Sequence, residues 1–421
     1  MALQYITLIR LSIACHFEGA KRLRNPIAPK ANEKSASLIL SGSGIMDSSY
    51  NRRELLTRLA RCACALGACR LLAPGTALAQ EEITPAEVTF YKKLPDAKIR
   101  CEICPKQCEI ADLERGYCGN KENRKGVYYS LVYGKCCSAH IDPIEKKPLF
   151  HYLPSTQAFS IAAAGCNFEC KFCQNWNIAQ YRPEQVDSFS LPPREVVSLA
   201  RQKKCPTIAY TYTEPVVFYE YMFDTAKQAR SEGIGSVMIS NGYINEAPLR
   251  ELCRHLTGVK IDLKAFSEQF YKEHCSGELQ PVLTTLKNLR KIGIWYEIVV
   301  LLIPTLNDSQ HEIRQMCQWV KSELGAEVPL HFTRFHPMYK IQNLPATPVK
   351  TLENARAAAR EAGLHYVYLG NVSGHEGENT YCPGCGEIVI GRVGYHIVKN
   401  VIKRGACPTC GHRIPGVWEP I

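Results

Sequence analysis

Several features that mark particular classes of protein are missing from this sequence. No segment contains the roughly 18 uninterrupted apolar residues that a membrane-spanning helix requires, and there is no internal repeat. Positive charge is concentrated in the first 80 residues, which hold 11 Lys and Arg against 4 Asp and Glu; residues 81–421 carry only +4 of the formal net charge of +11. We therefore expect neither a stable membrane span nor a nucleic-acid partner.

Cysteine, by contrast, is abundant, with 21 Cys in 421 residues. A secreted disulfide framework usually serves a short chain with a small core, whereas this chain is long and 46% hydrophobic. Eleven of the Cys instead form three groups spaced like metal ligands: Cys101, Cys104, Cys108 and Cys118; Cys166, Cys170 and Cys173; and Cys382, Cys385, Cys407 and Cys410. Thiolate ligands need reducing conditions, which favours the cytoplasm. Four Cys that stand singly are interpreted as core residues: Cys205, Cys253, Cys275 and Cys317.

The first 80 residues form a basic leader that complicates this localisation. Arg52 and Arg53 precede a short apolar stretch that ends in Ala-Leu-Ala before Gln80, which is similar to a twin-arginine export signal. Arg70 interrupts the apolar stretch, so a basic leader with incidental similarity is an equal interpretation. Met46 lies just upstream of the paired arginines and adds the hypothesis that translation starts there.

Apolar runs alternate with amphipathic stretches between residues 158 and 377. We expect strands at 159–165, 207–212, 236–240, 258–263, 296–303, 330–335 and 366–369, with helices at 194–203, 218–232, 248–255, 281–292, 311–324 and 352–362. This alternation predicts an α/β fold with a parallel sheet, as a partial or full (β/α) barrel. Small Cys-rich metal-binding segments should flank it, at residues 81–157 and 378–421.

The triplet Cys166, Cys170 and Cys173 has the form C-x3-C-x2-C and follows the first expected strand. Phe172, directly before the third Cys, is a further candidate for cofactor binding. A four-iron cluster with four Cys ligands is a closed electron carrier, whereas three ligands leave one iron open. An open iron can bind the amino and carboxylate groups of S-adenosylmethionine, and one-electron reduction then yields a 5'-deoxyadenosyl radical. A zinc knuckle fits less well because structural zinc takes four ligands.

Polar residues follow the later strands, at the end where barrels of this kind carry their chemistry. Glu214, before Pro215, can accept hydrogen bonds from the ammonium group of S-adenosylmethionine, although a Glu before Pro is also common in plain turns. Asn241 follows the third strand, and its side-chain amide can hydrogen bond to a ribose hydroxyl. The alternative interpretation is that Asn241 only forms a strand-to-helix turn.

The fourth and sixth strands end in charged residues. Asp262 and Lys264 are two positions apart and point the same way, so they should pair with each other or with a charged ligand. Arg334 and His336 share the end of the sixth strand and are further candidates for cofactor binding. A lone His is more often structural, but this one obeys the same positional rule.

Together these residues resemble the radical S-adenosylmethionine superfamily, and within it the pyruvate formate-lyase activating enzymes. The resemblance implies that the triplet holds a [4Fe-4S] cluster and that cluster or S-adenosylmethionine binding also involves Glu214, Asp262, Lys264 and His336. One departure is Tyr212-Thr213-Glu214, where activating enzymes have Gly-Gly-Glu.

A closer resemblance is to the radical S-adenosylmethionine enzyme of the AmmeMemoRadiSam system. It rests on the Cys-Glu-Ile-Cys-Pro start at residues 101–105, on Ile-Asp-Pro-Ile-Glu-Lys-Lys-Pro-Leu at 141–149 and on the C-terminal Cys-Pro-x-Cys-Gly pair. It covers about residues 98–421.

The sequence does not decide which metal the two outer Cys groups bind. Cys382, Cys385, Cys407 and Cys410 form two knuckles, each followed by Gly, which favours a zinc ribbon first and a rubredoxin-like single iron second. The spacing of Cys101, Cys104, Cys108 and Cys118 fits either zinc or a second iron-sulfur cluster that relays electrons.

The favoured hypothesis is a radical enzyme supplied with single electrons by a donor such as flavodoxin or ferredoxin. Its substrate is a glycyl position on a partner protein, a peptide or a small molecule. The competing hypothesis is a non-catalytic iron-sulfur or zinc protein that carries electrons or binds a partner. That protein would need neither an open iron nor Glu214, Lys264 and His336.

Overall fold

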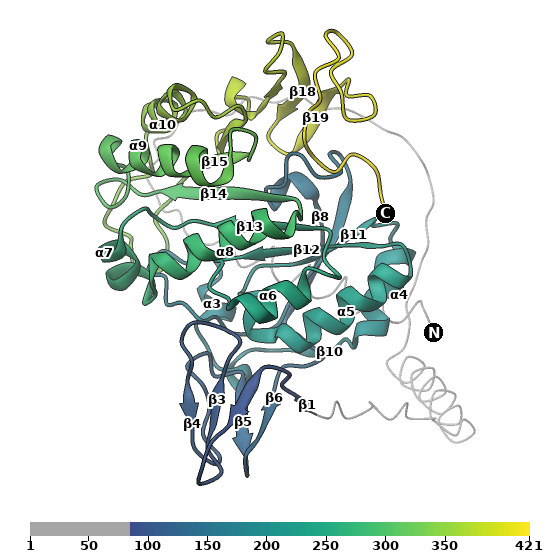
Figure 1. Ribbon diagram of the computed structural model, residues 1–421, viewed down its shortest axis with the longest axis vertical. Coiled ribbons are helices and arrows are strands. Elements are labelled where there is room, and N and C mark those ends of the chain that lie inside the picture. The colour runs from purple at the N-terminus through teal and green to yellow at the C-terminus, as the bar shows by residue number, and fades with distance from the viewer. Residues whose placement is uncertain (1–84) are drawn as a thin grey trace, which may run out of the picture. The chain divides into compact units, whose positions relative to one another are not determined.

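The computed structural model describes residues 85–421, and an eight-stranded sheet is the centre of this part of the chain (Figure 1). Its strands, in spatial order, are β16 (Val367–Gly370), β15 (Leu330–Arg334), β14 (Tyr296–Leu302), β13 (Gly258–Asp262), β12 (Gly235–Ser240), β11 (Thr207–Tyr210), β9 (Gln157–Ala162) and β8 (Ser138–Pro143). Neighbouring strands from β9 to β16 are parallel, whereas β8 pairs antiparallel with β9. Since β8 and β16 are the two edges, the sheet is open, as in a partial barrel.

Helices connect successive parallel strands, as the alternating pattern predicts. They are α4 (Pro193–Gln202), α5 (Tyr219–Ser231), α6 (Glu246–Leu252), α8 (Leu279–Ile292), α9 (Gln310–Trp319) and α10 (Val349–Glu361). Figure 1 shows α5, α6 and α8 in front of the strands. Local sequence sets several boundaries: Pro193 begins α4, and Gly293, at φ +78°, ends α8 in the left-handed conformation that glycine adopts without strain. Beyond α9 the chain continues in a π-helical turn, Val320–Leu324.

The two faces of the sheet differ because side chains alternate along each strand. On β14, Ile298 and Val300 belong to the large apolar core that includes the helices, while Glu297, directly before Ile298, points to the opposite face. We call that opposite face the inner face. Its apolar part, around Ala209 and Val237, packs against the segment 144–153, which follows β8.

A buried carboxylate fastens this segment to the inner face. Glu297 is fully buried and accepts hydrogen bonds from the backbone N–H groups of Phe150 and His151, at 2.9 and 2.8 Å, from the Trp295 indole at 3.2 Å and from His331 at 2.7 Å. Burial alone raises the pKa of Glu297, but the His331 hydrogen bond and these amides hold it below its ordinary value.

Smaller sheets flank the large one. In the N-terminal part they are β1 (Ala86–Glu87) with β6 (Val127–Ser130) and β5 (Lys121–Arg124), and β2 (Tyr91–Lys93) with β3 (Ile99–Cys101) and β4 (Glu109–Ile110). In the C-terminal part they are β17 (Thr380–Tyr381), β18 (Ile388–Val393) and β19 (His396–Asn400). A two-stranded ribbon joins β7 (Lys135–Cys136) to β10 (Phe189–Ser190). Short helices complete the chain: Ile144–Lys146, α3 (Trp176–Ala179), Pro183–Gln185, Pro215–Phe218, α7 (Glu268–Phe270), Tyr271–Cys275 and Glu376–Glu378.

Two sequence expectations concern the ends of these regions. Strand β8 lies in the expected N-terminal Cys-rich segment, residues 81–157, yet it pairs with the large sheet. The expected leader, residues 1–80, with its export and start-site hypotheses, lies outside the described residues. Within residues 85–421, no helix is both long and apolar enough to cross a membrane.

Candidate iron-sulfur and S-adenosylmethionine site

The Cys triplet lies in the loop that follows β9, at the carboxyl ends of the parallel strands. Burial raises the pKa of Cys166, and it raises that of Cys173 to about 11. The charges of Cys170 and Cys173 also act on Cys166, and that of Cys170 acts on Cys173. The backbone N–H of Phe168 lies 3.4 Å from the Cys166 sulfur and donates to it. This loop therefore carries three buried or half-buried thiols whose charges interact, while their binding of a cluster stays a prediction.

Contacts from distant segments fix the shape of this loop. At its start, Gly165 has φ +95°, and a Cβ there would lie 2.5 Å from the Asn120 side chain, so only glycine fits. The N–H of Glu169 donates to the Cys275 carbonyl at 2.8 Å. The triplet loop also accepts a hydrogen bond: the backbone N–H of Lys340 donates to the Lys171 carbonyl at 2.9 Å. The loop is thus held from the N-terminal Cys-rich part, from the turn after α7 and from the loop after β15.

Cys275 is a site residue that the sequence did not reveal. Sequence spacing assigned it to the core, and it is indeed fully buried. Its thiol, however, hydrogen bonds to Cys170, and this contact, together with the charge of Lys264, lowers the pKa of Cys170. A cysteine so far along the chain gives no spacing signal, because the turn Tyr271–Cys275 brings it to the loop only in the folded structure.

Glu214 and Asn241 join the ends of β11 and β12. The Glu214 carboxylate accepts from the Ser240 hydroxyl at 2.7 Å, from the Asn241 N–H at 2.8 Å and from the Val216 N–H at 3.1 Å. Burial raises the pKa of Glu214 to about 7, against the lowering effect of these donors. Both carboxylate oxygens thus already have partners within the chain, and a direct bond from Glu214 to S-adenosylmethionine stays a prediction.

The side-chain amide of Asn241 faces the triplet loop. Its Nδ2 donates to Asn167 Oδ1 at 2.8 Å and lies 3.9 Å from the Cys166 sulfur. Asn167 in turn donates to the Tyr243 carbonyl at 3.0 Å. The end of β12 is therefore bonded to the first cysteine of the triplet, while a contact of Asn241 with a ribose stays a prediction.

Asp262 pairs with Lys264, as their spacing predicts. The two charged groups lie 3.1 Å apart, and Lys260, two residues earlier on β13, also donates to the Asp262 carboxylate. Burial alone raises the pKa of Asp262, but the two ammonium groups hold it below its ordinary value. The charge of Lys264 also reaches two of the thiols: it contributes to the lowered pKa of Cys170 and opposes the burial that raises the pKa of Cys173. This places a cation beside two of the three thiols.

Tyr212 is the departure from the Gly-Gly-Glu pattern, and the structure shows its consequence. Its φ of +66° lies in the left-handed region, where glycine is favoured. The phenol hydroxyl donates to Asp142 of β8, and the Tyr212 carbonyl accepts from the Asn175 side chain at 2.7 Å. Asp142 also pairs with the buried Lys147 at 2.5 Å. Asp142 and Lys147, both in the segment 141–149, thus hold the turn at Tyr212 in place.

The other predicted residues have fewer contacts with the triplet. Phe172 is buried, and its ring packs against Phe270 of α7 at a centroid distance of 5.8 Å. Arg334 donates to the Thr347 carbonyl at 2.8 Å, at the end of β15. His336 is exposed in the following loop. Their roles in cofactor binding stay predictions.

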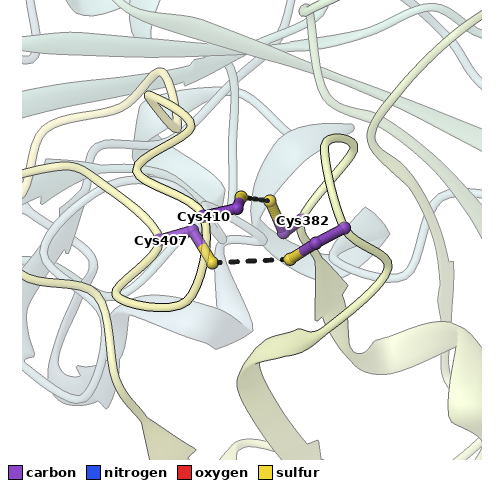
Figure 2. Close-up of side chains that lie close together, drawn as sticks. Cys382, Cys407 and Cys410 are labelled. Atoms are coloured by element: carbon purple, nitrogen blue, oxygen red, sulfur yellow. Dashed lines mark hydrogen bonds between the residues drawn. The ribbon is translucent and has the colours of Figure 1, made fainter.

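The C-terminal Cys group is compact (Figure 2). Cys382 and Cys410 have sulfurs 3.5 Å apart, those of Cys385 and Cys407 are 3.7 Å apart, and all four lie within 4.8 Å of one another. Two thiolates on one zinc, each at about 2.3 Å, can be at most about 4.6 Å apart. The group therefore has nearly the dimensions of a single tetrahedral ion.

Comparisons with known proteins agree with this geometry. The model of the radical SAM superfamily matches residues 160–320, which include the triplet. An uncharacterized protein of Methanocaldococcus jannaschii is 49% identical over 330 residues, covering 78% of this chain and 98% of that protein. The chain belongs to the radical SAM superfamily. It is also 23% identical over 200 residues to the pyruvate formate-lyase-activating enzyme of Clostridium pasteurianum, covering 43% of this chain and 81% of that enzyme.

Among solved structures, a radical SAM methyltransferase from Sphaerobacter thermophilus matches 77% of this chain and 87% of its own, with 14% identity and a TM-score of 0.43. A domain of a pyruvate-formate lyase-activating enzyme from Bacteroides vulgatus matches 39% and 98%, with 16% identity and a TM-score of 0.35. The narrower likeness to the AmmeMemoRadiSam system stays a prediction.

The residues present fit the cofactors that this superfamily implies. Cys166, Cys170 and Cys173 provide three thiols, and the charge of Lys264 favours the thiolate forms of Cys170 and Cys173. The ends of β11, β12 and β13 add carboxylate, amide and ammonium groups next to them. Such groups match the charged amino acid part and the polar ribose of S-adenosylmethionine.

Proposed function

We propose that this radical SAM protein is an enzyme that cleaves S-adenosylmethionine reductively and abstracts a hydrogen atom from a substrate. The bound [4Fe-4S] cluster and S-adenosylmethionine would supply the chemistry, namely one-electron cleavage to a 5'-deoxyadenosyl radical. The observation that carries the proposal is the loop with Cys166, Cys170 and Cys173 at the carboxyl ends of the strands, where the charge of Lys264 reaches Cys170 and Cys173.

The chain's own residues have distinct tasks in this proposal. The three Cys hold the cluster and leave one iron free. Asn241 and Lys264 surround the thiols with an amide donor and a cation. Glu214 acts as a positioning residue, because it ties the end of β11 to the backbone of Asn241. The hydrogen bond from Tyr212 to Asp142 holds the turn at Tyr212, which follows β11.

The test is the formation of 5'-deoxyadenosine. Full-length protein is reconstituted anaerobically, reduced with dithionite and given S-adenosylmethionine. We expect 5'-deoxyadenosine from the wild type and from Cys205→Ala, a matched control that removes a buried thiol in the turn before β11. Cys170→Ala should form none. A wild-type protein with an intact, reduced cluster that forms no product would favour the non-catalytic electron carrier instead.

For the substrate we propose a glycyl position of a partner protein. The support is the similarity to the Clostridium pasteurianum enzyme, whose name states that it activates pyruvate formate-lyase. A partner protein labelled with deuterated glycine should transfer deuterium to 5'-deoxyadenosine, as mass spectrometry can measure. Deuterium transfer from a labelled small molecule, with none from labelled proteins, would contradict this substrate class.

For the C-terminal group we propose a structural zinc ion. Support comes from the closeness of its four sulfurs and from the four-thiolate composition. Metal analysis of purified full-length protein should find about one zinc per chain. One extra iron in place of that zinc would indicate a rubredoxin-like site.

A further inference from the structure

The N-terminal Cys group is a second thiol cluster next to the triplet site. Cys101 ends β3, Cys104 and Cys108 lie in the following loop, and Cys118 precedes β5. Each thiol has a backbone N–H directed at its sulfur: Ile103 for Cys101, Lys106 for Cys104, Tyr117 for Cys108 and Asn120 for Cys118. Amides aimed at sulfur are typical of loops that bind metal through thiolates.

The spacing of these sulfurs differs from that of the C-terminal group. In residues 85–421, only Cys382, Cys385, Cys407 and Cys410 bring three or more ligand atoms all within 4.8 Å of one another. The N-terminal thiols are more widely spread, although close enough for their charges to interact. A four-iron cluster places each thiolate on a different iron, so its ligands stand farther apart than those of one ion. This spacing favours a cluster over zinc.

A buried lysine compensates charge in this group. Lys121 is 1% exposed, and its ammonium donates to Glu220 at 3.0 Å and to the Val217 carbonyl at 2.8 Å. Its charge also reaches Cys101 and Cys118 and opposes the rise in their pKa that burial causes. Cations and hydrogen bonds near the sulfurs are the means by which proteins tune the reduction potential of such clusters.

The group also lies beside the triplet. Cys118 and Cys166 line the same cavity of about 1040 Å³. Next to Cys118, the Asn120 amide donates to the Ala164 carbonyl, just before the triplet loop. Tyr117 donates its hydroxyl to Glu169 within that loop, at 2.7 Å. The two thiol groups are therefore joined through short stretches of protein.

We propose that Cys101, Cys104, Cys108 and Cys118 bind a second [4Fe-4S] cluster that passes electrons to the triplet site. The second cluster takes one electron from a low-potential donor protein of the ferredoxin or flavodoxin class and gives one electron to the first. The donor is oxidised by one electron, and no proton or bond is exchanged. Binding of the second cluster stands by itself, whereas the relay rests on the proposed function.

Iron analysis tests the binding. In the full-length chain, Cys166→Ala, Cys170→Ala and Cys173→Ala are combined, and the protein is reconstituted anaerobically beside the wild type. We expect about eight cluster irons per chain in the wild type and about four in the triple variant, with an electron paramagnetic resonance signal that S-adenosylmethionine does not change. A triple variant that holds zinc but no cluster iron at the N-terminal group would overturn the proposal.

The reciprocal variant checks folding. Cys104→Ser combined with Cys108→Ser should lose about four irons and keep both a signal that S-adenosylmethionine changes and the C-terminal metal. Cys205→Ala is the control for loss of a thiol elsewhere. If the double variant misfolds, the single Cys108→Ser still tests the assignment, since it should alter the second signal alone. A second signal left unaltered by both variants would refute the assignment.

Two reductants test the relay. With dithionite, the double variant should form 5'-deoxyadenosine at nearly the wild-type rate, because a small reductant reaches the triplet site directly. With reduced flavodoxin, its rate, and the reduction of the first cluster followed by electron paramagnetic resonance, should fall about tenfold or more. Equal rates with flavodoxin would overturn the relay. A wild type inactive with both reductants would refute the proposed function, while the iron analysis still decides the second cluster.

Discussion

The carboxylate of Glu214 accepts a hydrogen bond from the backbone N–H of Asn241 at 2.8 Å, which ties together two strand ends beside the triplet. Glutamine has the same shape but only one acceptor oxygen. Its amide N–H groups would face either the Asn241 N–H or the Ser240 hydroxyl.

We therefore expect Glu214→Gln to lower the free energy of unfolding by about 1–3 kcal/mol. The same substitution should reduce 5'-deoxyadenosine formation, while the amount of bound cluster iron should stay that of the wild type. Urea denaturation and iron analysis provide the measurements. Glu246→Gln, which breaks an exposed pair with Arg250, should change stability by less than about 1 kcal/mol. Equal effects of the two substitutions would contradict a positioning role for Glu214.

The left-handed backbone at Tyr212 predicts an unusual order of stabilities. Tyr212→Gly and Tyr212→Ala both lose the hydrogen bond to Asp142, but only alanine keeps the strain of a positive φ. The glycine variant should therefore be more stable than the alanine variant by about 1 kcal/mol. At Thr211, whose φ is not positive, the order should reverse. Thermal unfolding of the four variants gives the comparison, and an alanine variant as stable as glycine at position 212 would show that no strain is present.

Three charged residues at the end of β13, the buried Lys260 and the partly buried Asp262 and Lys264, lead us to expect a destabilisation that a second substitution relieves. Asp262→Asn leaves the ammonium groups of Lys260 and Lys264 without their shared partner, which should cost about 3–5 kcal/mol of stability. Adding Lys260→Met should restore part of this loss by removing one of the two charges. Urea denaturation measures both. If the double variant is no more stable than Asp262→Asn, charge repulsion is not the cause.

Buried titratable groups on the inner face lead us to expect a lower free energy of unfolding in acid. Burial lowers the pKa of His331 and lowers that of His151 to about 4, near Glu297, Arg392 and Lys260. An unfolded chain binds protons at these imidazoles below about pH 6.5, before the folded protein does. The free energy of unfolding should thus fall as the pH drops from 6.5, and the depressed pKa of Glu297 adds to the loss below about pH 4.3.

His331→Gln isolates one part of this effect. The glutamine amide can still donate toward Glu297 but does not titrate, so the loss of stability between pH 7 and 5 should shrink by up to about 1.4 kcal/mol per pH unit. His311→Gln, on the exposed side of α9, is the control and should leave the pH dependence unchanged. A wild type whose stability is constant over this range would refute the prediction.

Removal of the C-terminal metal should loosen only the C-terminal ribbon. Cys410→Ser, or treatment with a chelator, should remove about one metal ion per chain and make residues 378–421 sensitive to protease, because four-thiolate sites supply much of the folding energy of such ribbons. The cluster iron of the triplet should stay. Limited proteolysis with mass spectrometry checks this, and unchanged zinc in Cys410→Ser would contradict the assignment.

Much of the sheet could be predicted from local patterns. The expected strands 236–240 and 258–263 correspond to β12 and β13, since buried parallel strands are continuous apolar runs. Strand β8 was missed because its sequence, with His140 and Asp142, has no such run; it becomes a strand by pairing with β9. The pairing of Asp262 with Lys264 could be predicted, because residues two apart on a strand share a face.

The sequence by itself determined the number of thiols in each Cys group and the order of most strands and helices, because thiol count, spacing and periodicity are local properties. Tertiary structure alone decided which distant residues meet. It brought Cys275 to Cys170, tied Tyr212 to Asp142 and placed Cys118 and Cys166 on the same cavity. Such contacts depend on strand pairing and loop packing over long separations, which no local pattern encodes. For that reason the triplet could be found from spacing, while its surroundings required the fold.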